Sequence, residues 1–139
     1  SDLFWPSDNA ARAMARSMSA EMHSSFQNLR KACSMNIRRR YPAKPLTAEV
    51  QADVVRIVSL WAEARSRYGS GGDFLFGEFG AADIMFAPIV TRFATYSIPV
   101  PRFAATYCEA IFEHRFVQDW IAGAQEEDWV IEKFEQEAE

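Results

Sequence analysis

The sequence predicts an all-α fold, and three observations support this prediction. Apolar residues recur at intervals of three and four along most of the chain, which is the spacing of a helix that buries one face. Strict alternation of apolar and polar residues, which is typical of half-buried strands, is almost absent. Residues 84–91 carry no charge, and a helix that is apolar on every side belongs in the middle of a bundle. We therefore expect a helical bundle around one buried central helix.

The size and composition fit a single domain that spans residues 1–139. Apolar residues make up 49% of the chain, which is enough for a sizeable core. No apolar run approaches the ~20 residues that a membrane-spanning helix needs. The N-terminal residues 1–10 contain neither a basic region nor the apolar stretch of a signal peptide. We expect no membrane association and a cytoplasmic location.

The first expected helix begins at a cap formed by Ser7 or Asp8. It should fade near Asn36, because Pro42 and Pro45 cannot continue a helix and favour extended geometry in the residues before them. Its core stripe consists of apolar residues at helical spacing: Met14, Met18, Met22, Phe26, Leu29 and Cys33.

The second expected helix begins at Thr47, whose hydroxyl can cap it, and stops at the glycine-rich run 69–72. That run lacks the strand-to-helix context and the Lys-Ser/Thr pair of a phosphate-binding loop, so it predicts a helix end and no nucleotide site. The apolar side of this helix carries Val50, Val54, Ile57, Val58, Trp61 and Tyr68.

The central helix should begin after Gly80, with Asp83 at its third position. In a capping box, a Ser or Thr at the cap and an acid at the third position each accept a backbone hydrogen bond. Glycine supplies no side-chain oxygen, so only the Asp83 half of the box is present. Pro88 removes one backbone hydrogen bond inside the helix, and we expect a bend there.

Shorter amphipathic helices should follow the sequence IPVP at residues 98–101. We expect a last helix in the acidic C-terminal tail, anchored by Trp129 and Phe134. The apolar residues are Phe103, Tyr107, Ala110 and Ile111 in the first of these helices and Phe116, Val117, Trp120 and Ile121 in the second.

The cysteines and the charge argue against two classes of function. Cys33 and Cys108 lie far apart and outside any CxxC or Cys/His cluster, so the sequence predicts buried thiols and no metal site. The net charge of −4 argues against nucleic-acid binding. We interpret the basic run at residues 38–40 as a solvated loop.

The chain resembles the C-terminal domain of cytosolic glutathione S-transferases over nearly its whole length. The likeness rests on FLFGEFGAADIMFAP at residues 74–88, on the helix entry FWPSDNAARA at residues 4–13, and on VQDWIAGAQEE at residues 117–127. The family has a Ser/Thr-x-x-Asp box at the start of its buried helix. This chain keeps the aspartate, Asp83, but has Gly80 at the cap.

The segment EMHSSF, at residues 21–26, is similar to a Glu-x-His-x-x-Phe run in the bacterial, beta-like members of the family. The resemblance implies that His23 is catalytic, that Glu21 and Ser24 contact glutathione, and that hydrophobic substrate lies against Met22, Phe26, Met85, Arg92 and Tyr96. The alternative is that Glu21, His23 and Ser24 are only exposed positions on the solvated side of a core helix.

The resemblance also implies a function. The domain would bind the hydrophobic electrophile of a glutathione S-transferase, while a thioredoxin-like N-terminal domain, absent from this chain, would bind most of the glutathione. We then expect a homodimer in the full-length parent, no metal, and no activity of this chain alone. The alternative is a non-catalytic protein–protein interaction module of the same fold. The chain is expected to be an excised domain, although a stand-alone helical protein is the competing explanation.

Overall fold

The computed structural model describes residues 4–126. This part of the chain is all-helical and has no strands beyond isolated β-bridges in residues 74–78, so the all-α prediction is confirmed. The helices are α1 (Asn9–Ser24), α2 (Gln27–Ala32), α3 (Ala48–Tyr68), α4 (Ala81–Thr95), α5 (Arg102–Glu113) and α6 (Arg115–Gln125).

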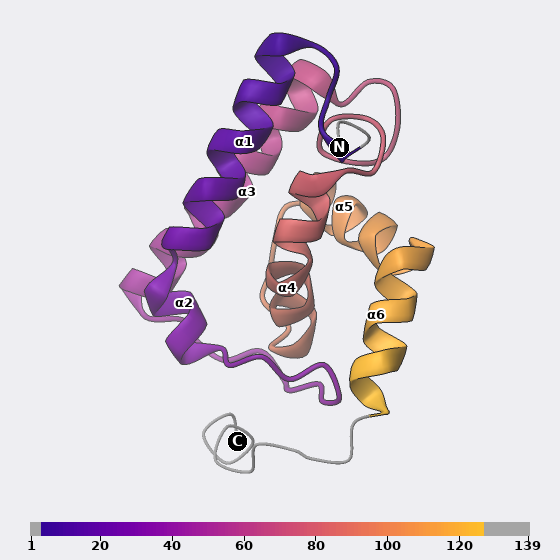
Figure 1. Ribbon diagram of the computed structural model, residues 1–139. Helices are drawn as coiled ribbons and strands as arrows, with labels where there is room; N and C mark the ends of the chain where they lie inside the picture. Colours follow the sequence, from indigo (N-terminus) through magenta and orange to yellow (C-terminus); the bar gives the residue numbers. More distant parts are fainter. Residues whose placement is uncertain (1–3, 127–139) are drawn as a thin grey trace.

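Figure 1 shows α1 and α3 side by side, with α4 in the middle and with α5 and α6 on its other side. Trp61, on α3, lies fully buried at the centre of the core. Its ring contacts Phe86 and Phe93 on α4 and Tyr107 on α5, with ring centroids 4.8–5.9 Å apart. The predicted buried central helix is therefore α4, and aromatic rings join it to its neighbours.

The first helix begins as predicted but ends much earlier. Asp8 caps it, because its Oδ2 accepts a hydrogen bond from the Ala11 backbone N–H at 2.9 Å. The helix stops at Ser24 instead of continuing towards Asn36. Phe26 has a left-handed backbone with φ 66°, which ends one helix and redirects the chain into α2.

The redirected helix α2 keeps the predicted apolar stripe in the core. Phe26, Leu29 and Cys33 are all buried, and α2 packs against α3. The Leu29 N–H, in the first turn of α2, donates to Asp53 Oδ2 on α3 at 3.0 Å. Tertiary contacts with α3 therefore hold the short helix in place, where helix propensity alone would give one continuous helix.

Helix α3 has the predicted bounds. Thr47 Oγ1 accepts from the Val50 N–H at 3.2 Å, and Gly69 is the C-cap. Just before that end, Arg65 Nη1 donates to the backbone carbonyls of Gly69, Gly72 and Phe74 at 2.6–2.8 Å. One guanidinium group thus fixes the path of the loop between α3 and α4.

Helix α4 begins at the predicted cap, and Asp83 is almost completely buried there. Its Oδ2 accepts from the Gly80 N–H at 2.8 Å, and its Oδ1 accepts from the Leu75 N–H at 3.2 Å and from the Tyr107 hydroxyl at 2.8 Å. The carboxyl group therefore ties the cap of α4 to the preceding loop and to α5. The helix continues through Pro88 to Thr95.

The predicted helices after residue 101 are α5 and α6. His114 separates them and caps α6, because its Nδ1 accepts from the Phe116 N–H at 3.1 Å. Its ring also stacks on Phe79, with centroids 3.7 Å apart. The further helix expected around Trp129 and Phe134 lies outside the described residues.

Candidate functional site

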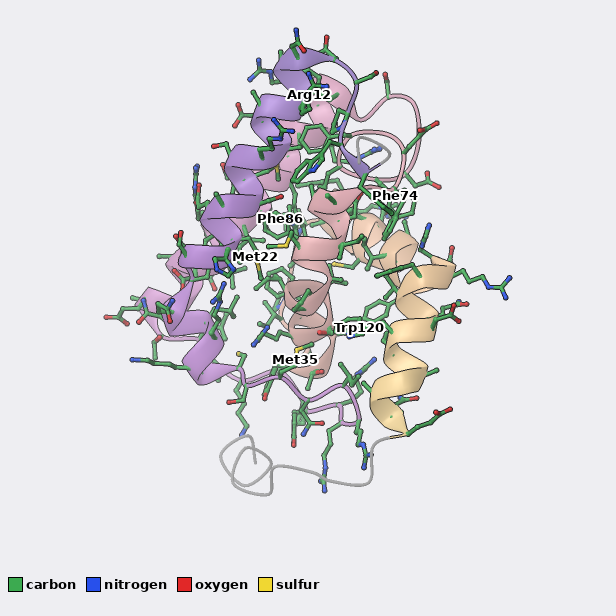
Figure 2. The ribbon with its side chains drawn as sticks, in the orientation of Figure 1. Arg12, Met22, Met35, Phe74, Phe86 and Trp120 are labelled. Atoms are coloured by element: carbon green, nitrogen blue, oxygen red, sulfur yellow. The ribbon has the colours of Figure 1, made fainter. Side chains whose placement is uncertain are left out.

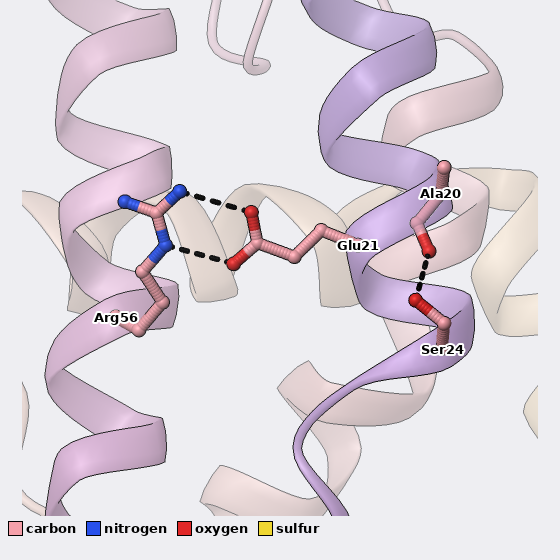
Figure 3. A network of polar contacts seen from close by, with 4 residues as sticks. All are labelled: Ala20, Glu21, Ser24 and Arg56. Carbon is pink, nitrogen blue, oxygen red and sulfur yellow. Dashed lines mark hydrogen bonds and ion pairs between the residues drawn. The ribbon is translucent and has the colours of Figure 1, made fainter.

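The predicted site residues Glu21 to Phe26 lie at the end of α1 and in the break before α2. The side chain of Glu21 forms a two-point ion pair with Arg56 on α3, shown in Figure 3. Arg56 Nε and Nη2 donate to the two carboxylate oxygens at 2.7 and 2.9 Å. These hydrogen bonds hold the pKa of Glu21 below its ordinary value. Glu21 is thus held in a fixed position by the neighbouring helix.

His23 and Ser24 are both exposed on the last turn of α1. The Ser24 hydroxyl donates to the Ala20 carbonyl at 3.0 Å within the helix. Within residues 4–126, the structure records no hydrogen bond to the His23 ring. The imidazole nitrogens can therefore donate to, or accept from, a bound molecule.

Met22 and Phe26 are buried members of the hydrophobic core, and Met85 on α4 is partly buried against it. Figure 2 shows side chains filling the space between α1 and α4, among them Met22 and Phe86. In this domain the apolar residues predicted to contact substrate are also core residues. Met22 and Phe26 therefore expose little surface to a ligand.

The other two predicted substrate residues, Arg92 and Tyr96, bond to the backbone that follows α2. Arg92 Nε donates to the Cys33 carbonyl at 2.9 Å, and the Tyr96 hydroxyl donates to the Ser34 carbonyl at 2.7 Å. Burial raises the pKa of Tyr96 to about 12, so this phenol stays protonated. These contacts join the end of α4 to residues 33–34 and leave Arg92 and Tyr96 apart from any recorded bond with His23.

On one continuous helix, Ser19, His23 and Arg30 would form a polar strip, but the structure does not contain this strip. Ser19 is buried, and Arg30 lies on α2 beyond the break. Arg30 Nη2 donates back to the carbonyls of Met22 and His23, the latter at 3.2 Å. The left-handed turn at Phe26 therefore folds Arg30 over the end of α1.

Sequence reasoning missed the partners of these residues. Arg56 had no assigned role, although it lies opposite Glu21 once α1 and α3 pack side by side. A signal was available, because Arg56 belongs to the polar side of a helix whose apolar side was correctly assigned. The register between two helices is needed to pair it with Glu21, and the sequence does not supply that register.

A cavity of about 570 Å³ lies near the opposite end of α1, where α1 and α4 both begin. We call it the N-terminal cavity. Its walls are formed by residues 4–8, by the end of α3 and by residues 76–83, and they include none of the predicted site residues. The sequence signal that could have found it is the density of aromatic residues in FLFGEF and near Trp5.

The described residues also bear on metal binding and on membranes. Residues 4–126 contain no group of His, Cys, Asp and Glu that could hold a metal ion. No helix within the same range is long and apolar enough to cross a bilayer.

The fold defines a small all-α domain built around a buried helix that an aspartate caps. Residues 47–124, more than half of the chain, match the family model for the C-terminal domain of glutathione S-transferase, and the chain belongs to this family. Comparison with curated proteins gives no match. The matched region covers α3 to α6 and includes Met85, Arg92 and Tyr96, but it begins after Glu21, His23 and Ser24.

Proposed function

We propose that this chain is the electrophile-binding domain of a cytoplasmic, beta-like glutathione S-transferase that conjugates glutathione to hydrophobic electrophiles. The enzyme would be a homodimer in which a thioredoxin-like domain binds most of the tripeptide. Its active site must favour the thiolate form of glutathione and hold an apolar electrophile beside it. The helical domain would contribute an apolar surface and polar groups at the edge of that surface.

The observation that carries the proposal is the position of His23. Its ring is exposed on the last turn of α1, directly after buried Met22 and two residues after Glu21, whose carboxylate Arg56 holds in place. A neutral imidazole there can donate a hydrogen bond to a developing anion or accept one from the thiol. Glu21 and Ser24 supply the remaining polar contacts, and we assign them to glutathione bound across the dimer.

The test is substitution of His23 in a polypeptide that joins this chain to its glutathione-binding domain. His23→Ala should lower kcat/KM for an aryl halide by about tenfold or more, because loss of a general acid or base typically costs 10²–10⁴-fold and loss of a polarising contact costs less. The melting temperature should change little, since the ring is exposed. Ser17→Ala, at an exposed position on the same helix, is the matched control and should be silent.

Phe26→Ala separates the functional role from the structural one. Removing this buried ring should lower stability by about 3–5 kcal/mol and weaken electrophile binding as well. Full activity of His23→Ala, both at saturation and well below it, would show that the histidine is only the solvated side of a core helix.

A specific observation favours a second candidate, a non-catalytic interaction module. Arg92 and Tyr96 are already bonded to backbone carbonyls, and Met22 and Phe26 are packed in the core. These contacts within the fold are enough to account for the four residues without a substrate. The module is the correct choice if the joined polypeptide binds glutathione normally but conjugates no aryl halide.

A further inference from the structure

The N-terminal cavity has the size and the lining of a small-molecule site. Ligand pockets typically measure ~300–1,000 Å³ and are lined by apolar and aromatic groups with a few polar ones, and this cavity measures about 570 Å³. Its walls include the aromatic rings of Phe4, Trp5, Tyr68, Phe76 and Phe79.

The charges on these walls have one sign. The lining includes Asp8, Glu78 and Asp83, and no Lys, Arg or His is among the described residues that form it. Asp8 caps α1 and Asp83 lies in the first turn of α4, so each offsets the positive end of a helix dipole. Glu78 has no such partner. Its side chain is exposed and forms no hydrogen bond or ion pair within the part of the chain that the structure describes.

Two arginines of the neighbouring segments, Arg12 and Arg65, bond to other groups. Arg12 donates to the carbonyls of Pro6 and Ser7 and to Asn9 Oδ1 at 2.6–3.3 Å. Arg65 donates to the three loop carbonyls already described. Neither arginine forms an ion pair with Glu78 within the described residues.

The rings around the cavity already attract cations. Arg16 lies over the Trp5 ring at 5.6 Å from its centroid, and Arg67 lies over Tyr68 at 5.3 Å. A ring face carries negative partial charge, so a cation within ~6 Å of the centroid is attracted to it. Phe76 stacks on Tyr68 from the loop side and has no such guanidinium partner among the described contacts.

We infer that the N-terminal cavity binds an aromatic organic cation, with the Phe76 ring against it and the Glu78 carboxylate as its counter-charge. Aromatic walls with a single unpaired carboxylate are the chemistry that recognises a substituted ammonium ion. The site is separate from His23 at the other end of α1 and does not depend on the proposed transferase activity.

The experiment is calorimetric titration of the 139-residue chain with benzyltrimethylammonium at constant ionic strength. A ligand of this size should bind with a Kd of about 1 mM or tighter. Benzyl alcohol and benzoate are the neutral and anionic comparison ligands, and each should bind at least about tenfold more weakly, because each lacks the cation. Quenching of tryptophan fluorescence that disappears in Trp5→Phe would place the cation in this cavity.

Two variants test the assigned groups. Glu78→Gln keeps the size of the side chain and should weaken binding about three- to tenfold. Phe76→Leu keeps an apolar wall without the π face and should weaken it to a similar extent. Glu109→Gln, an exposed carboxylate on α5 outside the cavity, is the matched control and should leave the Kd unchanged. Equal affinity for benzoate, no binding of the cation up to several millimolar, or an unchanged Kd in Glu78→Gln would each overturn the inference.

Discussion

At the scale of single residues, Asp83 connects three parts of the domain. Its carboxyl group accepts hydrogen bonds from the cap of α4, from the loop at Leu75 and from Tyr107 on α5. The sequence predicts only the first of these, because a cap is a local contact between residues three apart. The contacts with Leu75 and Tyr107 depend on tertiary structure, and they make Asp83 a joint between three elements.

The stability of the domain should depend on pH through Asp83. Burial raises its pKa from the ordinary 3.8 to about 6, against the effect of its hydrogen-bond donors. The folded state therefore binds a proton more tightly than the unfolded state. This contribution is fully present below about pH 4 and is lost as the pH rises through 6, and a shift of this size corresponds to about 3 kcal/mol.

The measurement is chemical denaturation between pH 4 and pH 7, compared with the same series for Asp83→Asn. The difference in unfolding free energy between the two proteins should change across this range, because the Asp83→Asn variant lacks the carboxyl group that titrates. If Asp83→Asn lowers stability too far for denaturation curves, the Asp83 carboxyl resonance can be followed by NMR. A midpoint near 4 in that titration would contradict the prediction.

At the scale of helices, caps could be predicted and the interruption of the first helix could not. The sequence indicates Ser7 or Asp8, Thr47 and Gly80 as caps, and in the structure Asp8, Thr47 and Gly80 each precede a helix. The break between α1 and α2 depends on a left-handed backbone at Phe26. Phenylalanine seldom adopts that conformation, so the local sequence does not predict a helix break at Phe26. Burial of the ring and the packing of α2 on α3 outweigh the local preference.

Completing the capping box of α4 should destabilise the domain. A Cβ atom at Gly80 would lie 2.6 Å from the Phe4 carbonyl oxygen, which is closer than a real contact allows. Gly80→Ser would add a cap oxygen worth a few tenths of a kcal/mol. The clash with backbone should cost about 1–3 kcal/mol, so the net effect is a loss.

Thermal denaturation distinguishes the two effects. Gly71→Ala is the matched control, because a Cβ there meets no atom within 4 Å and should leave stability unchanged or slightly higher. A Gly80→Ser chain that melts above the native one would mean that the residues around Phe4 yield at little cost.

At the scale of the whole molecule, the 139-residue chain should be a monomer or a weak dimer. The large apolar side chains that are exposed among the described residues come from four different elements: Phe4, Val55, Phe103 and Phe116. Stable homodimers instead bury a continuous apolar area. Sedimentation velocity at tens of micromolar should give a species near 15.8 kDa. A tight dimer at that concentration would show that a proposed transferase dimer needs no second domain to form.

Much of the fold follows from sequence, and less of the candidate sites does. The central helix is identifiable because its lack of charge is a property of one segment. Glu21 and Arg56 are 35 residues apart and meet only when two helices pack in one register. The N-terminal cavity likewise needs the end of α3 and the starts of α1 and α4 to converge. Contacts of this kind are set by packing, and spacing along the chain does not reveal them.

The Arg65 side chain has a consequence for how the sequence of this domain can change over time. It holds the loop after α3 through backbone carbonyls alone, and every residue type has a carbonyl. Substitutions at the exposed positions Ser70, Gly71 and Asp73 would leave the three bonds intact. Gly69 and Gly72 are exceptions. A Cβ at Gly69 would lie 2.6 Å from the Arg65 carbonyl oxygen, and a Cβ at Gly72 would lie 2.3 Å from the Gly77 carbonyl oxygen. Gly71 lines the N-terminal cavity. A substitution there would change the cavity wall in a related protein and keep the path of the loop.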